Sequence, residues 1–382
     1  MAGIGTPPFG KYFDRDLGSL AQEAVSEALV DSGFGPEAIQ YVVFSNAAAG
    51  VLSGQEMIRG QVSLKGTGLA GVPIVNTENA CASGSTAAHL AWLAVASGQV
   101  DVAMAVGAEK LFHEDKQRSF AAIESGTDLS LSEQGEDVTG GSVMMASYAK
   151  EARRYSDRNG DVNAALTAVA VKNRRYAADN PSAQFRTPIT AADVEASRPV
   201  ADPLRLLTCS PLTDGAAAIV FRAAGAASFG HRSPVTVRFS NMVSYKPGTS
   251  AVERAAKRAY SATGLTPNEI DVFQLHDACA FAEVVQYEQV GIALPGEGAE
   301  AVLSGRTGPG GDSPVNSDGG LLSRGHALGA TGLSQLSELV RQLRGDAGPR
   351  QVTNPRYALA VNSGGWMGDD YATSVATVLS AA

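Results

Sequence analysis

The 382-residue sequence lacks a disulfide framework, membrane-length apolar runs and a secretion signal. Its three cysteines are an odd number without a Cys-x-x-Cys spacing, which predicts free thiols in a reducing compartment. No apolar run is long enough to span a bilayer, and the first residues lack the basic and apolar regions of a signal peptide. These absences predict a cytoplasmic protein that does not enter a membrane.

Positive charge and nucleotide motifs are also lacking. The net charge of −9 disfavours nucleic acid or an anionic membrane as the main partner. No Gly-x-Gly-x-x-Gly follows a first strand, and no Walker A motif occurs, so nucleotide-dependent redox or phosphoryl chemistry is disfavoured. No cluster of His, Cys and Asp has metal-ligand spacing, so we expect no metal site.

What the chain does contain is an internal duplication. Residues 21–44 and 252–275 share a helical pattern, a Gly stop, a Pro-started turn and a β-rich run. Three positions recur 231 residues later, namely Gly33 as Gly264, Pro36 as Pro267 and Ile39 as Ile270. A length of 382 residues also favours two subdomains.

Further matching segments extend the duplication to both halves. Helical stretches at 87–96 and 333–343 precede the strand-like runs at 102–107 and 357–362. Apolar strands of this kind imply α/β sheets covered by helices on both faces. We therefore predict an N-terminal half at 1–223 and a C-terminal half at 231–382, separated by a small Gly/Ala/Ser stretch at 224–230. The polar excursion at 111–210, with a helix at 162–179, is expected to shape a site.

Cys81 lies between a short strand at 71–75 and the helix at 87–96, among small and polar residues. A buried cysteine is usually a small hydrophobe. Here the neighbours Ser-Gly-Ser-Thr at 83–86 would let a substrate approach, and a helix N-terminus favours thiolate. This context predicts a nucleophile.

Two of the five histidines stand in suggestive places. His276 ends a strand-like run at 271–275, and His326 lies in a Gly-rich loop before a helix. A histidine beside a cysteine can take the thiol proton so that the thiolate attacks an acyl carbon. Residues 362–365, Asn-Ser-Gly-Gly, are predicted to form a loop whose N–H groups help to hold an oxyanion.

Taken together, these motifs resemble the thiolase superfamily, and most closely its sterol-carrier-protein-type and thiolase-like branch. The matching stretches are Asn-Ala-Cys-Ala-Ser-Gly at 79–84, residues 198–204 and 209–217, His-Asp at 276–277 and Gly-His-Ala-Leu-Gly-Ala-Thr-Gly at 325–332. They are spread over nearly the whole chain. The resemblance implies the thiolase fold: an α/β protein of two βαβαβαββ halves in a five-layered α-β-α-β-α sandwich, with an inserted loop domain, usually a homodimer.

The resemblance also implies an acyl-CoA acyltransferase that cleaves or forms the carbon–carbon bond of a 3-oxoacyl-CoA in fatty acid or steroid degradation. Cys81 would accept the acyl group, and His326 would activate Cys81 and help to hold the thioester oxygen. His276 would help to bind the enolate of the second acyl-CoA. The amides of Cys81 and of Gly364 or Gly365 would form the other oxyanion hole. Coenzyme A or acyl-CoA would be the substrate, with no covalently bound cofactor.

The sequence departs from the resemblance at the second acid/base. Many thiolases carry a C-terminal Cys-x-Gly loop, but residues 362–365 contain no cysteine. The sterol-carrier-protein branch instead has a cysteine two residues after the motif histidine, where this chain has Ala278. Cys279, one residue further on, is the remaining candidate, although one step along the backbone usually turns a side chain elsewhere.

Three alternatives follow from this gap. Thiolase-like relatives also include aldol lyases for acyl-CoA side chains of steroids, which work with a small zinc-containing, OB-fold partner and tend to lack the nucleophilic cysteine. For such a variant, Tyr245, Tyr287 and Tyr371 are the candidate acids. Acyl transfer to a non-CoA acceptor is the second alternative, and a non-catalytic acyl-CoA or lipid-binding protein is the third. The presence of Cys81 favours acyl-enzyme chemistry.

Overall fold

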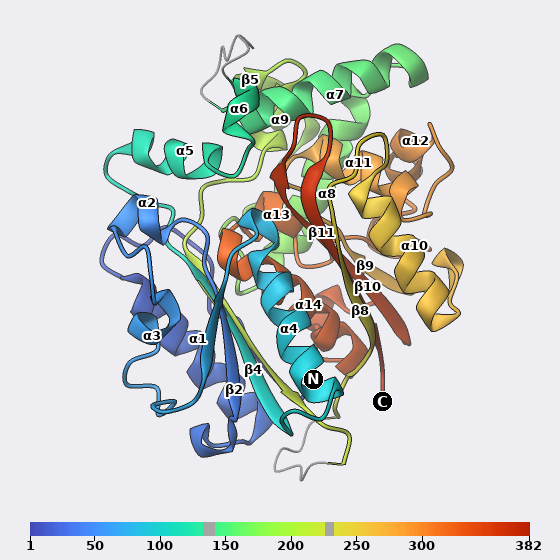
Figure 1. Cartoon of the computed structure of the whole chain (residues 1–382). Helices are drawn as coiled ribbons and strands as arrows, with labels where there is room; N and C mark the ends of the chain where they lie inside the picture. Colours follow the sequence, from blue (N-terminus) through green and yellow to red (C-terminus); the bar gives the residue numbers. More distant parts are fainter. Residues whose placement is uncertain (133–141, 226–232) are drawn as a thin grey trace.

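The computed structural model describes residues 1–132, 142–225 and 233–382 and consists of alternating layers of helices and sheets (Figure 1). Helix α1 (Leu17–Ser32) covers the outer face of a first sheet. Helices α4 (Ser83–Ala96) and α14 (Leu328–Arg344) lie between the two sheets, and α10 (Ala251–Thr263) covers the outer face of the second. This arrangement is the predicted five-layered α-β-α-β-α sandwich.

The two sheets have matching topologies. The first has the order β1-β7-β4-β2-β3 and the second the order β8-β11-β10-β9. In each, two antiparallel pairings are followed by a parallel one. The strands are β1 (Gly3–Gly5), β2 (Tyr41–Ser45), β3 (Ile74–Thr77), β4 (Val102–Glu109), β7 (Gly215–Arg222), β8 (Thr236–Ser244), β9 (Val272–Gln274), β10 (Tyr357–Trp366) and β11 (Tyr371–Ser380).

The second half lacks a full counterpart of β3. In the first half, β2 pairs in parallel with β3 over four residues. In the second, the parallel neighbour of β9 on that side is a single bridge between Phe273 and Val315. The predicted βαβαβαββ order therefore holds in full for the first half, whereas the third strand of the second half is reduced to one bridge.

The duplicated helices begin and end alike. The side chain of Asp16 caps α1 by accepting a hydrogen bond from the Ser19 amide, and Ser250 caps α10 in the same way. Both helices end at a glycine in the left-handed conformation, with φ of 71° at Gly33 and 72° at Gly264. Glycine adopts this conformation without the steric cost of a Cβ, so the repeated Gly stop has a direct physical cause.

The central layer is packed closely enough that its backbones touch. A Cβ on Gly84 of α4 would lie 2.8 Å from the carbonyl oxygen of Gly329 in α14. A Cβ on Gly332 would lie 2.7 Å from the Cβ of Ser85 and would overlap the Ser85 backbone nitrogen. Glycine at these positions lets α4 and α14 approach, which brings the starts of the two helices together.

The excursion at 111–210 forms a cover of helices over one end of the sandwich (Figure 1). Its helix α8 (Asn163–Ala178) packs against α11 (Ala280–Gln289) of the second half. Lys172 of α8 makes a buried ion pair with Glu283 of α11. The elements of the excursion are α5 (Lys116–Glu124), α6 (Leu129–Ser132), α7 (Val143–Asn159), α8 (Asn163–Ala178), α9 (Ala191–Ala196), β5 (Pro199–Ala201) and β6 (Leu204–Arg205).

The remaining helices are short connections, namely α2 (Ala49–Ser53), α3 (Arg59–Ser63), α12 (Gly298–Leu303) and α13 (Gly320–Ser323). Residues 226–230 of the predicted linker lie outside the described residues, and the proposed boundary between the halves stays a prediction. Within the described ranges, no helix is long and apolar enough to cross a membrane.

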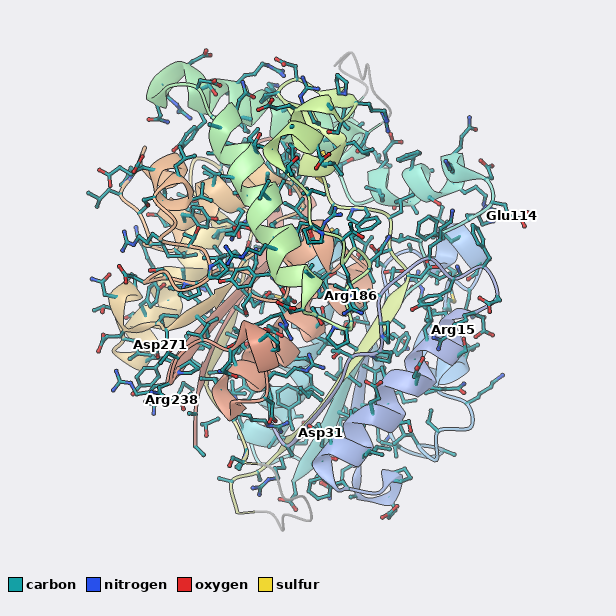
Figure 2. All side chains as sticks on the ribbon, turned by 180° about the vertical axis from the view of Figure 1, so that it is seen from behind. Arg15, Asp31, Glu114, Arg186, Arg238 and Asp271 are labelled. Carbon is teal, nitrogen blue, oxygen red and sulfur yellow. The ribbon has the colours of Figure 1, made fainter. Side chains whose placement is uncertain are left out.

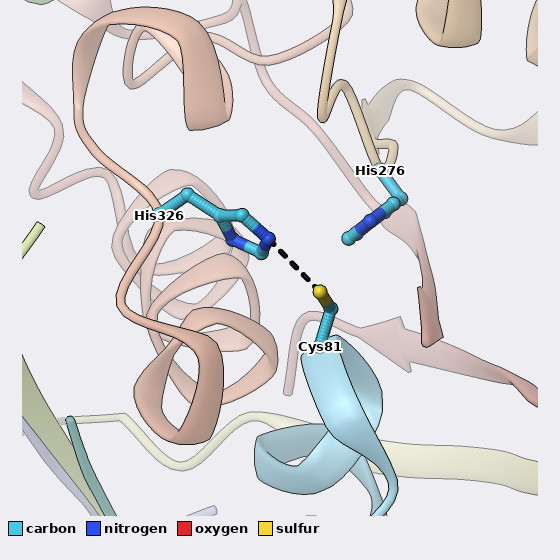
Figure 3. A group of neighbouring side chains, drawn as sticks. All are labelled: Cys81, His276 and His326. Carbon is cyan, nitrogen blue, oxygen red and sulfur yellow. Dashed lines mark hydrogen bonds between the residues drawn. The ribbon is translucent and has the colours of Figure 1, made fainter. Parts of the chain in front are cut away.

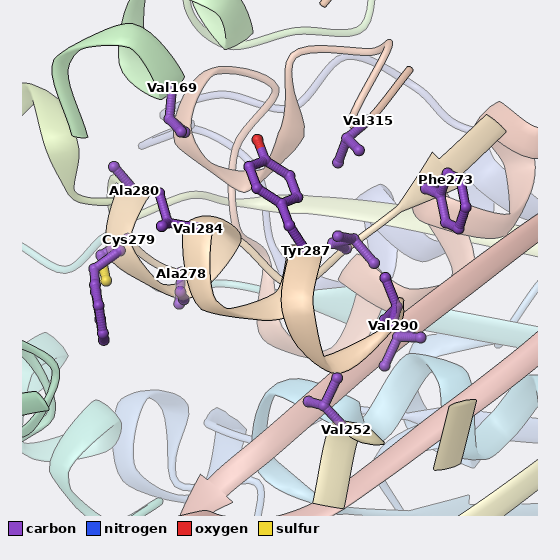
Figure 4. Packing of buried hydrophobic residues seen from close by; sticks show 14 of the residues in the cluster. Val169, Val252, Phe273, Ala278, Cys279, Ala280, Val284, Tyr287, Val290 and Val315 are labelled. Carbon is purple, nitrogen blue, oxygen red and sulfur yellow. The ribbon is translucent and has the colours of Figure 1, made fainter. Parts of the chain in front are cut away.

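Buried apolar side chains pack between the layers, and charged side chains lie mostly on the outside. Figure 4 shows part of the cluster around α11, in which Tyr287 is fully buried and donates a hydrogen bond to Glu283. Figure 2 shows charged side chains, such as Arg238 and Asp271, around the outer layers. One ion pair crosses between layers, because Arg344 at the end of α14 contacts Asp31 of α1 at 2.7 Å.

We predict that Gly332→Ala lowers the free energy of unfolding by about 1–3 kcal/mol, as overpacking of a filled interior does. The added Cβ meets backbone that cannot move without separating α4 from α14. This cost outweighs the roughly 1 kcal/mol by which Ala favours a helix over Gly. Denaturation midpoints in urea measure the change. Gly225→Ala is the control, because no atom of the described residues lies within 4 Å of its Cβ position; equal midpoints for the two variants would contradict the prediction.

Candidate active site

Cys81 lies in a tight turn, the 3₁₀ segment Ala80–Ala82, between β3 and α4, as predicted. The preceding residue, Ala80, has φ of 47°, a left-handed conformation that is unusual for a residue with a Cβ. Such a conformation costs about 1–3 kcal/mol and persists where the surroundings enforce it. The strained turn directs the Cys81 side chain towards the start of α14.

Three side chains meet at this point (Figure 3). The Sγ of Cys81 lies 3.2 Å from Nε2 of His326, and the His276 ring faces the same sulfur from the other side. The ring centroids of His276 and His326 are 5.3 Å apart. The structure therefore brings together the three residues that the sequence motifs singled out, from segments up to 245 residues apart.

The hydrogen bonds around His326 fix its proton. Thr331 donates its hydroxyl proton to the carbonyl of Ala327 at 3.0 Å, so its oxygen accepts from Nδ1–H of His326 at 2.8 Å. The lone pair of Nε2 therefore faces the Cys81 thiol, as a base requires. Sequence reasoning missed Thr331, although it lies five residues after His326 in the same motif, on the first turn of α14.

His276 has the opposite tautomer. The side-chain amide of Asn362 accepts from Ser85 at 2.7 Å and donates to Nδ1 of His276 at 3.0 Å, which leaves the proton on Nε2. Gln286 clamps the backbone of His276 by accepting from its N–H at 3.0 Å and donating to its carbonyl at 2.8 Å. His276 is thus held as a hydrogen-bond donor directed towards the sulfur side of the site.

Burial favours the uncharged forms of all three side chains. Burial raises the pKa of Cys81 to about 12, and the nearby charge of Glu109 adds to this effect. Burial lowers the pKa of His276 to about 3. The pKa of His326 lies well below its usual value, mainly because of burial and also because of the neighbouring His276 and Arg324. Burial therefore opposes the expected thiolate, because it raises the pKa of Cys81 where a helix N-terminus would lower it.

The same trio is the only group of three or more potential metal ligands found in the described residues. Its ligand atoms lie within 4.8 Å of one another, and a thiolate with two imidazoles is a soft-metal donor set. However, Nε2 of His276 carries a proton and has no lone pair to offer. The arrangement is better suited to hold a substrate oxygen than a metal ion.

Glu109 at the end of β4 joins the start of α14 to the loop that follows β2. Its carboxylate accepts from the Gly329 amide at 3.0 Å and from the amides of Ala47 and Ala48 at 2.9 and 3.1 Å. It also accepts from the side chain of Asn46 at 2.7 Å. Glu109 therefore holds the first turn of α14, which begins two residues after His326. Sequence reasoning missed it, because Ala-Glu at a strand end has no distinctive spacing.

A cavity of about 1050 Å³ opens onto Cys81, His276 and His326. Residues of the excursion form much of its wall, including Phe112, Phe120, Met144, Tyr148, Phe185 and Leu206. The excursion therefore forms part of the wall of this cavity. Four basic side chains, Lys11, Arg59, Lys116 and Arg198, also line the cavity.

Not every predicted residue reaches this cavity. Ala278 lines it, whereas Cys279 is fully buried and packs in the apolar cluster around α11 (Figure 4). Cys209, opposite Cys279 on an isolated antiparallel bridge, does line the cavity. Of the three tyrosines considered as acids, only Tyr371 lines it.

Gly364 and Gly365 line the cavity beside Cys81, but the prediction of a loop there is wrong. Residues 362–365 belong to strand β10, where Ser363 and Gly364 pair with Ser374 and Thr373 of β11. The glycines are needed for close approach, because a Cβ on Gly364 would overlap the carbonyl oxygen of Asn79 in the turn before Cys81.

Comparison with known families gives two matches that together cover most of the chain. The family described as "Thiolase, N-terminal domain" matches residues 4–225, and the one described as "Thiolase C-terminal domain-like" matches residues 235–380.

Several characterised proteins are similar over nearly the whole chain. The acetyl-CoA acetyltransferase of Methanothermobacter thermautotrophicus is 36% identical over 377 residues, covering 96% of both chains. The benzoylsuccinyl-CoA thiolase subunit BbsB of Thauera aromatica is 34% identical, covering 96% of this chain and 94% of that protein. Human sterol carrier protein 2 is 32% identical, covering 95% of this chain and 69% of that protein.

Two solved structures have the same fold. The Ltp2-ChsH2(DUF35) aldolase superposes with a TM-score of 0.80 at 24% identity, covering 100% of this chain and 97% of that chain. Human mitochondrial 3-ketoacyl-CoA thiolase superposes with a TM-score of 0.73 at 16% identity, covering 100% and 98%.

The neutral site makes a prediction for thiol reactivity. Because the pKa of Cys81 is raised to about 12, the thiolate fraction near neutral pH is small and grows with pH. We expect the rate of Cys81 alkylation by iodoacetamide to rise about tenfold per pH unit between about pH 7 and 9. Peptide mass mapping separates Cys81 from Cys209 and Cys279. A rate that levels off below about pH 8 would instead reveal a preformed thiolate–imidazolium pair.

Proposed function

This chain belongs to the thiolase family and is an acyl-CoA acyltransferase of thiolase type, and on that premise we propose that Cys81 is the nucleophile that carries the acyl group. As a thiolase it acts on CoA thioesters without a separate cofactor. The observation that carries the proposal is the 3.2 Å hydrogen bond between the Cys81 sulfur and the unprotonated Nε2 of His326.

In the proposed acylation, His326 takes the thiol proton as Cys81 attacks the acyl carbon. Burial raises the pKa of Cys81 and lowers that of His326, which favours neutral groups until a thioester is in place. The developing oxyanion would accept from the amide of Cys81 and from an amide of Gly364 or Gly365. The Cys81 amide suits this role, because amides in the first turn of a helical segment lack carbonyl partners.

We propose that His276 serves the second substrate. Its Nε2–H is directed into the site, and burial holds its pKa at about 3, so it donates a hydrogen bond without becoming charged. A neutral donor stabilises the oxygen of a thioester enolate without transferring its own proton fully. Once His326 has taken the proton of Cys81, it can act as an acid and return that proton to Cys81 later in the reaction.

The cavity supports a CoA thioester as the bound species. Its apolar and aromatic wall would accommodate an acyl chain and the pantetheine arm. Basic side chains such as Lys116 and Arg198 would attract the phosphates of CoA. We propose acyl-CoA intermediates of fatty acid or steroid degradation as the substrates.

The first test is acylation of Cys81. After mixing with acetyl-, butanoyl- or octanoyl-CoA, we expect intact-mass spectrometry to show a gain equal to the acyl group. Cys81→Ala should lose the adduct and reduce turnover by roughly 10⁴-fold or more, as removal of a nucleophile does. Cys279→Ala is the matched control, because it removes a thiol that does not line the cavity. Turnover that persists in Cys81→Ala would favour the aldol-lyase alternative.

We also propose that the protein is a homodimer in the cytoplasm. Strand β3 lies at the edge of the first sheet, and Val75 on it is 39% exposed. An exposed sheet edge is a common pairing surface between chains. All three cysteines are free, as expected of a reducing compartment. A small zinc-ribbon or OB-fold partner is a further proposal, and it rests on the resemblance to thiolase-like aldolases.

Light scattering during size-exclusion chromatography tests the assembly. The purified protein should have about twice the chain mass of 39.3 kDa. Val75→Lys should reduce this mass towards that of the monomer, because two like charges would face each other across a paired edge. A monomeric wild type would contradict the dimer. A second, smaller protein that co-purifies from the native host would identify the partner.

A further inference from the structure

Carbon–carbon bond cleavage requires a proton donor that the proposed roles leave unassigned. When Cys81 takes the acyl group of a 3-oxoacyl-CoA, the other fragment leaves as a thioester enolate, whose α-carbon must be protonated. His326 faces the sulfur, and His276 offers its proton to an oxygen. Cys279 does not line the cavity. The remaining cavity-lining groups with a dissociable proton near the trio are Cys209, Tyr148 and Tyr371.

Tyr371 is the best placed of these three. Its ring packs edge-on against His276, with centroids 5.8 Å apart and planes at 89°. It is the first residue of β11, held directly opposite Trp366 of β10, just beyond the two cavity-lining glycines. Cys209 lies on another segment, opposite Cys279 on an isolated bridge, and no ring contact or hydrogen bond joins it to the trio in the described residues.

The hydrogen bond between the two tyrosines decides which proton is free. The hydroxyl of Tyr148 donates to the hydroxyl of Tyr371 at 3.0 Å. The only hydroxyl proton of Tyr148 is therefore engaged in this hydrogen bond. Among the described residues, no acceptor is found for the proton of Tyr371, which therefore remains available to a ligand in the cavity.

We propose that Tyr371 is the catalytic acid that protonates the α-carbon of the departing enolate, with Tyr148 stabilising the tyrosinate that results. The inference rests on the proposed acyl-enzyme function. The bond from Cys81 Sγ to the 3-carbon forms as the bond between the 2- and 3-carbons breaks. The electron pair moves into the enolate, and the 2-carbon then takes the proton of Tyr371.

The proton balance closes in the second half of the reaction. The tyrosinate takes the thiol proton of the incoming CoA, whose sulfur attacks the acyl-Cys81 thioester. Cys81 leaves as a thiolate and recovers its proton from His326. Burial raises the pKa of Tyr371, and the hydrogen bond from Tyr148 partly opposes that rise. Tyr371 thus keeps its proton until a carbanion is present, and its anion is basic enough to deprotonate a thiol.

The test compares two reactions of Tyr371→Phe, using whichever of acetyl-, butanoyl- or octanoyl-CoA acylates the wild type best. The first is the Cys81 adduct, which needs no proton at the α-carbon and should form at a rate within about threefold of wild type. The second is exchange of the α-hydrogens for deuterium in D₂O, together with thiolysis of the matching 3-oxoacyl-CoA. Both should fall by about 10²–10⁴-fold, the usual contribution of a general acid.

Two further variants complete the design. Tyr148→Phe keeps the ring but removes the supporting hydrogen bond, so deuterium exchange should fall by a smaller factor, about 3–20-fold for one hydrogen bond. Tyr245→Phe is the matched control, because the Tyr245 hydroxyl donates an exposed hydrogen bond to Asp369 outside the cavity. It should exchange deuterium at the wild-type rate.

The outcomes separate this inference from the proposed function. If the wild type forms no adduct with any of the three donors, the acyl-enzyme function itself fails. If the wild type is acylated but Tyr371→Phe retains exchange and thiolysis, only the role of Tyr371 is overturned. Loss of both adduct and exchange in Tyr371→Phe also overturns it, since the side chain would then act in binding. Loss of exchange in Cys209→Ala instead would assign the acid to Cys209.

Discussion

The contact between Cys81 and His326 is the interaction on which the arrangement of this protein depends. The two residues come from opposite halves of the chain, and each lies two residues before a helix of the central layer begins. A 3.2 Å hydrogen bond requires those two helix starts to meet, so α4 and α14 must pack backbone to backbone. Gly84 and Gly332 make that approach possible. The sheets and outer helices then fix the central pair from both sides.

The second constraint is burial, which keeps the site uncharged. Burial raises the pKa of Cys81 and lowers that of His326, and both shifts disfavour a thiolate–imidazolium pair. The same burial strengthens every hydrogen bond that meets a developing charge, because little water remains to screen it. Reactivity therefore depends on a thioester that supplies the electrophile and fills the cavity.

The sequence predicted those parts of the site that depend on local pattern. Cys81 and His326 were identifiable because a nucleophile at a strand–helix turn and a histidine in a Gly-rich loop have recognisable neighbours. The matched Gly stops at 33 and 264 revealed the duplication, and the resemblance then implied the layers.

The protonation state of Cys81 was not predictable, because it depends on burial by segments far apart in the chain. Gly364 and Gly365 were misjudged as a loop, since the pairing of Ser363 with Ser374 becomes visible only in the sheet. The sequence offered Tyr371 as a candidate acid but did not place it in the site. Its position beside Tyr148 of α7 follows from the β10–β11 hairpin and is visible only in the structure.

The interleaved central layer also has a consequence for synthesis on the ribosome. Helix α4 ends at Ala96, but its partner α14 begins only at Leu328. At a translation rate of roughly 5–20 residues per second, on the order of 10–50 s pass between the synthesis of α4 and that of α14, which covers it. During that interval the nascent first half presents an uncovered apolar face, which a molecular chaperone would have to shield. The close glycine contacts thus join two helices whose synthesis is separated by most of the chain.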